Sequence, residues 1–458
     1  MHDVIIIGAG PAGLFAADEL SKRGKKVLVL EKGGLISERT CPLTYEKVNA
    51  KCAYCPTCNI LSGVGGAGLF SDGKLNFIAK HGKTDLHQFV DEKEAESLLQ
   101  QVDDRLMEFG IPEESYPKDM EKVEHLKAEA KKIGIDFLVI RQKHIGSDKL
   151  PEIIGNMVKK LEEQGVIFAL HEEAYQVKVE NGEVKGVVTN KGTPEAPVVL
   201  CCPGRVGSEW FMNECRRLNI PLMHRGIEVG VRVEVPHQVM EQITDIVWDP
   251  TFFINTKAHD DMVRTFCTNP NGFVTTEKYD GFACVNGYSR HDKKSENTNF
   301  ALLSDINLTH PVSDTINYGK SIGQLSYTIG GKKPILQRFV DLKKGRRSYW
   351  DRIHKSMIKP TMTDVTPGDL SMAFPGRIAD NLIESLEKLD KLIPGIANDS
   401  TLLYGPEIKF FSVRVKTEKN LATQVKGLFV AGDGVGVCGN IVGAAATGII
   451  AARGILNS

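Results

Sequence analysis

The sequence predicts an α/β protein whose first domain is split along the chain by an inserted α+β domain. An apolar run at 3–7, a glycine-rich turn with a helical stretch at 12–23, and a second apolar run at 26–30 are together typical of a βαβ unit. The same pattern of apolar strand, glycine loop and helix returns from Gly427 onward. Between these regions, residues 209–404 combine mixed strand patterns with many Asn, Thr and Lys residues. The end of the chain is therefore expected to complete the first domain.

The predicted domain boundaries follow from these changes in pattern. Residues 1–208 and 405–458 form the split domain, and residues 209–404 form the inserted one. Within the first part, residues 90–134 are rich in Glu, Lys and Leu at helical spacing, which indicates a helical insertion. A chain of 458 residues that is 41% hydrophobic has enough apolar side chains to build both cores.

The charge balance disfavours several classes of partner. The chain has 57 Lys and Arg residues against 58 Asp and Glu residues, which gives a formal net charge of -1. Such a balance creates no overall field for nucleic acid or an anionic membrane, so we expect neither as a partner. The N-terminal sequence begins a strand directly, and the apolar stretch at 441–456 is short and contains Arg453 and glycines. We therefore expect a cytoplasmic protein with no membrane helix.

Three glycines between the first predicted strand and helix form a GxGxxG motif, namely Gly8, Gly10 and Gly13. They permit a tight turn and close approach of the backbone to a pyrophosphate, while the helix N-terminus offers free N–H groups to that anion. Glu31 ends the second predicted strand, where a carboxylate accepts a hydrogen bond from an adenosine ribose 2′-hydroxyl. These features predict a dinucleotide site without a 2′-phosphate; the alternative is a chance glycine turn.

The C-terminal region indicates which dinucleotide is bound. Asp433 lies in AGDGVG, after a predicted strand and before a predicted helix. This segment resembles the second FAD fingerprint of two-dinucleotide-binding flavoproteins, in which the acid binds the ribityl chain. Asp433 is also a candidate helix N-cap, and the two roles are compatible. No other GxGxxG follows a predicted strand, so the electron donor stays open. The positions assigned to FAD are Gly8, Gly10, Ala12, Gly13, Glu31, Lys32, Gly66, Gly432, Asp433 and Ile441.

Four of the ten cysteines crowd into one segment, with the spacing Cx10CxxCxxC. They are Cys41, Cys52, Cys55 and Cys58. Four thiolates can hold an iron–sulfur cluster or a tetrahedral zinc, and a CxxCxxC triplet with one remote cysteine favours a [4Fe-4S] cluster. The alternatives are a structural zinc, a redox dithiol and inert thiols.

Several segments together resemble one family, the poorly characterised FAD-dependent dehydrogenases related to HI0933-like and glucose-inhibited-division-like flavoproteins. They are GGAGLFSDGK at 65–74, CPGRVGSEW at 202–210, RTFCTNPNGF at 264–273, NTNFALL at 297–303, TPGDLSMAFP at 366–375 and GPEIKFFS at 405–412. The resemblance implies a Rossmann-like FAD-binding domain, an inserted substrate domain and bound FAD. It implies no particular substrate. The four-cysteine segment is expected in only part of that family.

Candidates for catalysis lie in the inserted domain, because a flavin needs the protein to supply orientation and a proton source. Arg264, His291, Arg346 and Arg347 are candidates for binding a carboxylate or phosphate. Lys409 lies just beyond the inserted domain, where the chain returns toward the FAD-binding domain, and is a candidate for favouring the reduced flavin anion. The alternative for each is an ordinary ion pair, which for Lys409 would be with Glu407 or another acid. Cys438 is expected to be an inert core thiol.

The sequence therefore predicts an FAD-dependent oxidoreductase that moves electrons between an iron–sulfur cluster, FAD and a small organic substrate. A ferredoxin-like protein or a nicotinamide is the expected donor. The competing hypothesis is a flavoprotein that acts on RNA or another macromolecule, with a structural zinc or thiol cluster. Its best support is the basic segment 343–359, KKGRRSYWDRIHKSMIK, which is also the pattern of an ordinary amphipathic helix.

Overall fold

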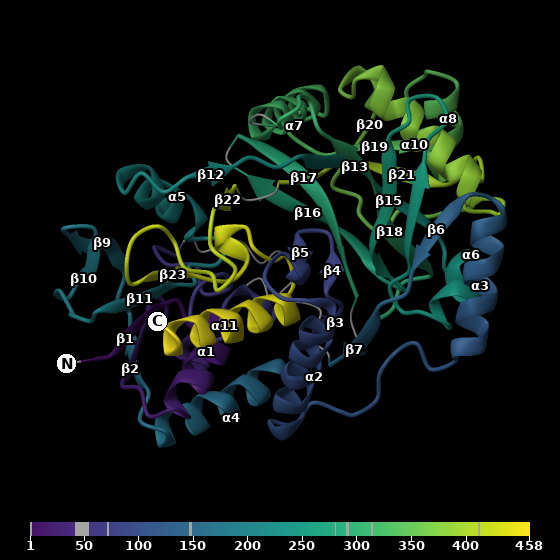
Figure 1. The fold of residues 1–458 in the computed structure, drawn as a ribbon. Helices are drawn as coiled ribbons and strands as arrows, with labels where there is room; N and C mark the ends of the chain where they lie inside the picture. Colours follow the sequence, from purple (N-terminus) through teal and green to yellow (C-terminus); the bar gives the residue numbers. More distant parts are fainter. Residues whose placement is uncertain are drawn as a thin grey trace. The chain divides into compact units, whose positions relative to one another are not determined.

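The computed structural model describes residues 2–41, 55–70, 73–145, 149–279, 281–289, 293–312, 315–410 and 413–458 (Figure 1). The chain divides into two compact units. The first unit comprises residues 1–114, 142–223 and 412–458, and the second comprises residues 115–141 and 224–411. The first unit is thus built from three separate stretches of chain.

A parallel sheet forms the centre of the first unit, with the strand order β23-β11-β1-β2-β8. Its strands are β1 (Val4–Ile7), β2 (Val27–Glu31), β8 (Ile167–Leu170), β11 (Val198–Cys201) and β23 (Leu428–Val430). Every residue of β1 is at most 7% exposed, as a continuous apolar strand in a covered parallel sheet should be. Because β23 comes from the C-terminal stretch, the end of the chain completes the sheet that β1 begins, as the sequence predicted.

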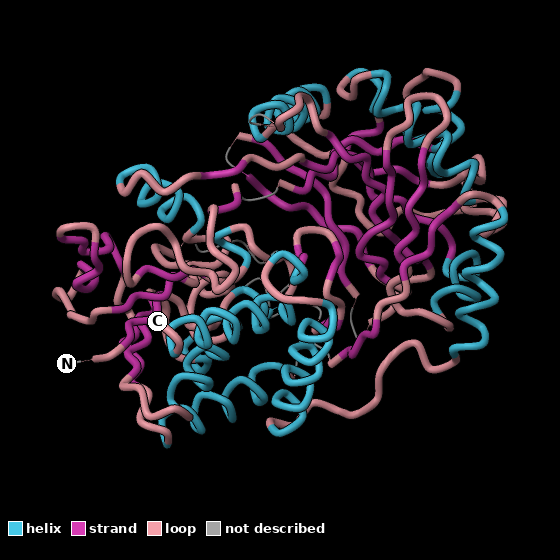
Figure 2. The backbone as a smooth tube through the Cα atoms, viewed as in Figure 1, coloured by secondary structure: helices cyan, strands magenta, loops and turns pink. Residues whose placement is uncertain are grey.

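Helices pack around this sheet (Figure 2). They are α1 (Pro11–Ser21), α2 (Glu92–Glu108), α4 (Leu150–Glu163), α5 (Ser208–Arg217) and α11 (Ile441–Leu456). Helices α1 and α11 approach closely at Gly448, where an added Cβ would lie 2.2 Å from the carbonyl oxygen of Ala12. Within the described residues, no helix has both the length and the apolar character needed to cross a membrane.

Short strands and turns complete the first unit. A hairpin of β9 (Ala174–Glu180) and β10 (Glu183–Thr189) turns at Asn181 and Gly182, both with positive φ, as the Asn-Gly pair predicts. The other short elements are η1 (Ile36–Glu38), η2 (Ala67–Phe70), β3 (Lys74–Phe77), β4 (Lys80–His81), β5 (Thr84–Asp85), η3 (Leu86–Gln88), β7 (Arg141–His144), β12 (Leu222–Met223), β22 (Arg414–Val415) and η5 (Asp433–Val435).

The second unit contains a mixed eight-stranded sheet with the order β20-β19-β21-β13-β18-β15-β14-β6. Its strands are β6 (Ile135–Leu138), β13 (Ile227–Pro236), β14 (Thr251–Asn255), β15 (Met262–Asn269), β18 (Asn297–Ile306), β19 (Ile335–Arg338), β20 (Thr366–Pro367) and β21 (Leu402–Lys409). A separate hairpin consists of β16 (Phe273–Tyr279) and β17 (Phe282–Tyr288). The remaining elements are α3 (Met120–Lys132), α6 (His237–Thr244), α7 (Ile316–Ile329), α8 (Phe339–Lys343), α9 (Trp350–His354), η4 (Leu370–Met372) and α10 (Gly376–Leu389).

The two faces of this sheet differ in chemistry. Along β13, Val229, Val231 and Val233 belong to the apolar core, to which α3, α6 and α10 also contribute. Because side chains alternate along a strand, Arg232 and Glu234 lie on the opposite face, where both are completely buried. The second unit thus has one apolar buried face. The opposite face, called the polar face here, buries charged side chains beside a smaller apolar cluster that includes Leu336, Leu402 and Tyr404.

Residues 115–141 lie in the second unit, although the sequence placed 90–134 as an insertion in the first domain. Helix α2 stays in the first unit, whereas α3 leads into β6. Strand β6 pairs in antiparallel fashion with β14 at the edge of the eight-stranded sheet. This long-range pairing assigns the segment to the second unit, and helical periodicity alone gives no indication of it.

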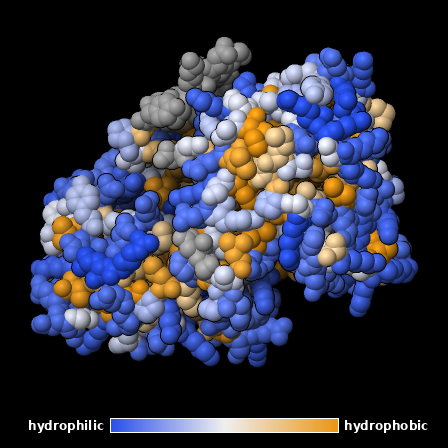
Figure 3. Space-filling view, turned by 90° about the horizontal axis from the view of Figure 1, so that it is seen from above, coloured by the Kyte–Doolittle hydropathy of each residue, from blue (hydrophilic) through white to orange (hydrophobic). Residues whose placement is uncertain are grey.

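The basic segment 343–359 is not one amphipathic helix. Helix α8 ends at Lys343, Gly345 has a φ of +57°, and α9 spans only Trp350–His354. The turn between the helices is organised by the buried Asp341, as described below. On the face seen in Figure 3, hydrophilic residues predominate and apolar residues form smaller areas among them.

Candidate functional site

The glycine turn between β1 and α1 has the geometry of an anion site. Gly8 has a φ of +103°, and a Cβ there would lie 2.2 Å from the carbonyl oxygen of Cys202. A Cβ on Gly13 would lie 2.0 Å from the carbonyl oxygen of Gly8, so both positions require glycine for the fold itself. At Gly10, by contrast, the nearest atom to an added Cβ is the Cα of Gly66, 3.9 Å away. Gly10 therefore keeps open space beside the turn.

Helix α1 begins directly after this turn, with Gly10 as its N-cap and Pro11 at its first position. Within the described part of the chain, no side chain caps its N-terminus. The first N–H groups of a helix lack intrahelical partners and carry the positive end of the helix dipole. The open space at Gly10 and the uncapped helix, which begins Pro11-Ala12-Gly13, fit the pyrophosphate of a dinucleotide.

Glu31 organises the loops around this turn. Its carboxylate accepts hydrogen bonds from the backbone N–H groups of Ala9 (3.0 Å), Gly33 (2.9 Å) and Gly63 (2.8 Å). A carboxylate has about four acceptor sites, so one remains for a ribose hydroxyl. Glu31 thus fits the adenosine role predicted for it and also joins three loops. Its neighbour Lys32 lies 3.5 Å from the exposed Glu173 in an ordinary surface ion pair.

The glycine-rich segment that includes Gly66 lies against the same turn. The N–H of Gly65 donates to the carbonyl of Ala9 at 2.8 Å. Gly66 has a φ of +62°, and a Cβ there would lie 3.2 Å from the Cα of Gly10. Two predicted cofactor positions from distant parts of the sequence, Gly10 and Gly66, are therefore brought together.

The second predicted fingerprint also meets this turn. Gly432 follows β23 with a φ of +88°, and a Cβ there would lie 3.1 Å from the Cβ of Ala12. Ile441 is the first residue of α11 and would lie 3.3 Å from a Cβ added at Gly68. The N-cap of α11 is Asn440, which accepts from the N–H of Gly443, so Asp433 is not the cap of that helix. The cap lies elsewhere because a loop of several residues separates Asp433 from the helix.

Asp433 is instead held by two cations of the first unit. Its carboxylate lies 2.5 Å from Nε of Arg205 and 3.5 Å from Nζ of Lys83. Burial would raise the pKa of Asp433, but Lys83 and Arg205 outweigh it and hold the pKa below its ordinary value. Lys83 lies on the β4–β5 hairpin, where Thr84 Oγ1 accepts from the N–H of Gly439 at 3.0 Å. The acid expected to bind a ribityl chain thus stays ionised in a positively charged setting.

The lowered pKa of Asp433 predicts a dependence of stability on pH. A carboxylate with a depressed folded-state pKa stabilises the fold above its unfolded pKa, and this stabilisation disappears as the pH falls through the folded value. The ordinary value here is 3.8. We expect Asp433→Asn to lower the Tm of the FAD-free protein at neutral pH, and the difference to shrink as the pH falls below 3.8 toward the lower folded value. Thermal unfolding from pH 7 downward measures this, with the exposed Asp399→Asn as control. A difference that is constant over the whole pH range would contradict the assignment.

Lys83 and Arg205 were missed as site residues from the sequence. Arg205 lies within CPGRVGSEW, a segment that the resemblance includes, so a signal for it was present. Lys83 sits in KHGKTD, which reads as an ordinary polar turn. Its contact with Asp433 spans 350 residues of sequence, which no local pattern can predict.

The catalytic candidates of the second unit are engaged in ion pairs. Arg264 donates from Nε and Nη2 to the carboxylate of Glu228 at 2.5 and 2.7 Å, and both side chains are buried. Its Nη1 atom is buried and has no hydrogen-bond partner within the described residues. Lys409 lies 2.9 Å from Glu407, the partner expected for it. His291 lies outside the described residues.

Arg346 belongs to a cluster around the completely buried Asp341. Three arginines surround this carboxylate: Arg338 at 2.9 Å, Arg346 at 2.7 Å and Arg352 at 3.4 Å. Burial would raise the pKa of Asp341, but hydrogen bonds from Arg338, Ser348 and Arg346 lower it below its ordinary value. Arg346 therefore helps to order the turn after α8, which is the structural alternative given for it above.

The structure describes three of the four clustered cysteines. Cys41 is half-buried and Cys55 and Cys58 are exposed, while Cys52 lies outside the described residues. Among the residues that are described, no group of three or more His, Cys, Asp or Glu side chains is arranged to hold a metal ion. The proposed four-ligand set therefore cannot be assembled from the described residues alone. Burial raises the pKa of Cys438, which fits its predicted role as an inert core thiol.

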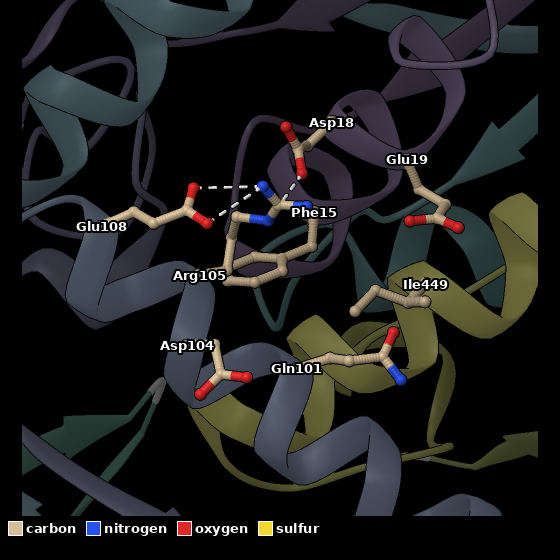
Figure 4. A pocket seen from close by; sticks show the side chains of 8 residues that line it. All are labelled: Phe15, Asp18, Glu19, Gln101, Asp104, Arg105, Glu108 and Ile449. Atoms are coloured by element: carbon tan, nitrogen blue, oxygen red, sulfur yellow. Dashed lines mark hydrogen bonds and ion pairs between the residues drawn. The ribbon is translucent and has the colours of Figure 1, made fainter.

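A pocket of about 220 Å³ in the first unit has a different character. Residues of α1, α2 and α11 line it, and Arg105 at its edge contacts Asp18 at 3.2 Å and Glu108 at 3.1 Å (Figure 4). Glu19 and Asp104 add further negative charge. An acidic lining repels phosphate, so this pocket is not a candidate for the pyrophosphate.

Comparison with known proteins agrees with the geometry of the turn. Residues 3–40 match a family model described as an FAD binding domain, and residues 226–409 match one described as FAD-dependent protein, C-terminal domain-like. A protein of Clostridium beijerinckii described as uncharacterized is 24% identical over 485 positions, which cover 99% of this chain and 80% of that protein.

Two solved structures also match this chain over nearly its whole length. The 3-ketosteroid-delta4-(5alpha)-dehydrogenase of Rhodococcus jostii RHA1 is 14% identical, with a TM-score of 0.46 over 99% of this chain and 96% of that chain. The glycine oxidase of Bacillus cereus is 13% identical, with a TM-score of 0.38 over 100% of this chain and 95% of that chain. Both are remote in sequence.

The first family match contains the glycine turn and Glu31, which form the candidate dinucleotide site described above. The fold and this site define the class of the protein, which is an FAD-dependent oxidoreductase. Within that class, the chain joins an FAD binding domain to a second domain that matches the FAD-dependent protein, C-terminal domain-like model.

Proposed function

We propose that this oxidoreductase moves electrons between a [4Fe-4S] cluster, FAD and a small organic substrate. The proposal that FAD binds here depends on one observation: the Glu31 carboxylate joins the loops around the open turn at Gly10. When bound, FAD supplies hydride and single-electron transfer. The chain itself supplies the anion site at α1, the Glu31 acceptor and the charged environment of Asp433.

The cluster proposal depends on the cysteine spacing and on how the described ends of the segment meet. Cys41 follows Thr40, and Cys58 precedes Asn59. The side-chain amide of Asn59 donates to the carbonyl of Thr40 at 3.1 Å, so the residues next to these two cysteines are in contact. This contact is compatible with a shared cluster, and the CxxCxxC triplet favours iron–sulfur over zinc.

We further propose that the protein belongs among the HI0933-like and glucose-inhibited-division-like flavoproteins, in a subgroup with the four cysteines. A cluster would accept single electrons, so a ferredoxin-like protein is the first donor to test, and a nicotinamide is the second. Arg264 is the best-placed candidate for an acidic substrate group, because its buried Nη1 has no partner among the described residues.

The alternative is a flavoprotein that acts on RNA, with the cysteines holding zinc. Its main support is the basic segment 343–359. Arg346 and Arg352 of that segment face Asp341, so part of their charge is already neutralised. We therefore rank this alternative second.

The test of the proposed function is an assay of iron, zinc and acid-labile sulfide on protein purified without oxygen. We expect about four irons and four sulfides per chain, with a broad absorption shoulder beside the flavin bands. One zinc per chain without sulfide would indicate a structural role for the cysteines. Nicotinamide donors and RNA substrates would then be tested first.

Replacing Cys52 and Cys55 by Ser is expected to remove the metal and to leave FAD bound. Two missing thiolates leave too few ligands for either a cluster or a structural zinc. The measurement is the ratio of metal and of FAD to protein, with Cys267→Ser of the second unit as control. Loss of FAD together with the metal would mean that the segment is needed for the structure of the flavin site.

A further inference from the structure

Arg39 is a buried cation bound almost entirely to main-chain oxygen atoms. Arg39 directly follows η1 in the sequence, and the residue is only 4% exposed. Burial lowers its pKa to about 10, so the guanidinium is still charged at neutral pH. It donates to five carbonyl groups, those of Asn59 (2.9 Å), Ile60 (2.8 Å), Gly63 (3.5 Å), Val64 (2.6 Å) and Gly66 (2.9 Å).

These carbonyls belong to the turn that lies against the dinucleotide site. In a planar trans peptide, the C=O of one residue and the N–H of the next point in opposite directions. The carbonyl of Val64 points to Arg39, and the following N–H, that of Gly65, points away and donates to Ala9 of the glycine turn. Arg39 thus fixes the orientation of the peptide that connects the two turns.

Glu31 holds the same turn from the other side. It accepts the N–H of Gly63, while Arg39 contacts the carbonyls of Gly63 and Val64. The fit is close, because a Cβ on Gly63 would lie 2.6 Å from Cδ of Arg39, and one on Gly33 would lie 2.4 Å from the nitrogen of Gly63. The position of the Glu31 carboxylate therefore depends on a turn whose own shape depends on Arg39.

We propose that Arg39 is a positioning residue of the FAD site, which sets the Gly63–Gly66 turn and through it the adenosine-binding carboxylate of Glu31. This role concerns FAD binding and does not depend on a metal at the cysteines. A guanidinium has five N–H donors in a fixed plane, whereas an ammonium has three on a flexible stem. A Lys side chain at this position keeps the positive charge but lacks the planar set of five donors. A Met side chain has neither the charge nor the donors.

The experiment compares Arg39→Lys and Arg39→Met with Arg105→Met, a control in the same unit whose partners are the acidic side chains of Asp18 and Glu108. FAD release from the holoenzyme is followed by flavin fluorescence. ADP, which carries only the adenosine and pyrophosphate groups, is then used to compete with FAD for the protein.

We expect Arg39→Met to weaken FAD and ADP binding by similar factors, on the order of 100-fold, because several charge-assisted hydrogen bonds are lost. Arg39→Lys should fall between this variant and wild type, and Arg105→Met should bind both ligands as wild type does. If Arg39 had a purely structural role, Arg39→Met would lower the Tm of the FAD-free protein without changing the affinity of the folded fraction for ADP.

Two results would overturn the proposal. One is ADP affinity in Arg39→Met equal to that in Arg105→Met. The other result applies if Arg39→Met does not fold. In that case the proposal is wrong if Arg39→Lys has a wild-type circular dichroism spectrum and unchanged affinity for FAD and ADP. Because both readouts are independent of metal content, they separate this proposal from the iron–sulfur proposal.

Discussion

Replacing Gly10 by Glu is expected to abolish FAD retention and to leave the fold intact. Gly10 has room for a Cβ, since the nearest atom to it would be the Cα of Gly66 at 3.9 Å. The carboxylate of the new side chain would occupy the open space beside α1, where the pyrophosphate is expected, and would repel it. We expect FAD affinity to fall by more than about 100-fold, because the anion site is both blocked and given the wrong charge.

The measurement is the ratio of flavin to protein after purification, together with circular dichroism. Gly155→Glu is the matched control, because Gly155 lies in α4 and no atom lies within 4 Å of a Cβ added there. A yellow, folded Gly10→Glu protein would contradict the placement of the pyrophosphate. Gly8 and Gly13 are unsuitable for this test, because a side chain at either would collide with the backbone.

The candidate FAD site could be predicted where its chemistry depends on local spacing. Gly8, Gly10, Gly13 and Glu31 lie on one βαβ unit, so the motif and the order of the elements fix their relative positions. Asp433 was predicted from a fingerprint of the same kind, and Gly432 beside it lies close to Ala12 at the start of α1. In each case one short segment of sequence contains the whole pattern from which the residue was predicted.

The rest of the site could not be predicted, because it depends on contacts between distant segments. Arg39 reads as one more charged residue in a polar stretch, and only the folded chain shows that it is buried against five carbonyls. The same is true of Lys83, whose acidic partner is in the C-terminal stretch. Ion pairs such as Arg264 with Glu228 also appear only in the folded sheet, where β18 separates the two strands that carry them.

The polar face of the eight-stranded sheet contains the pair with the largest expected effect on stability. Arg232 and Glu407 are both completely buried, and they form a bidentate pair at 2.8 and 2.6 Å. Burial would raise the pKa of Glu407, but Arg232 and Lys409 outweigh it and hold the pKa below its ordinary value. The glutamate is therefore ionised in the folded protein, and its removal would leave the buried Arg232 without its acidic partner.

We expect Glu407→Ala to reduce the free energy of unfolding by about 3–5 kcal/mol, the cost of breaking a buried ion pair from one side. Denaturant unfolding measures this change. The control is Asp364→Ala, which removes an exposed pair of the same unit, with Lys333 at 2.6 Å; we expect it to cost less than about 1 kcal/mol.

The sign of the pH dependence gives a second test of the same pair. Because the folded pKa of Glu407 is depressed, its contribution is present above the ordinary value of 4.5 and is lost as the pH falls through the folded value. The difference between wild type and Glu407→Ala should therefore shrink in acid. Equal losses for Glu407→Ala and Asp364→Ala would mean that the buried pair contributes no more than a surface pair. In that case the charges would not keep the polar face in place. Contacts with the β16–β17 hairpin, such as the 3.2 Å hydrogen bond from Arg232 to Asn286 of β17, would have to explain its order.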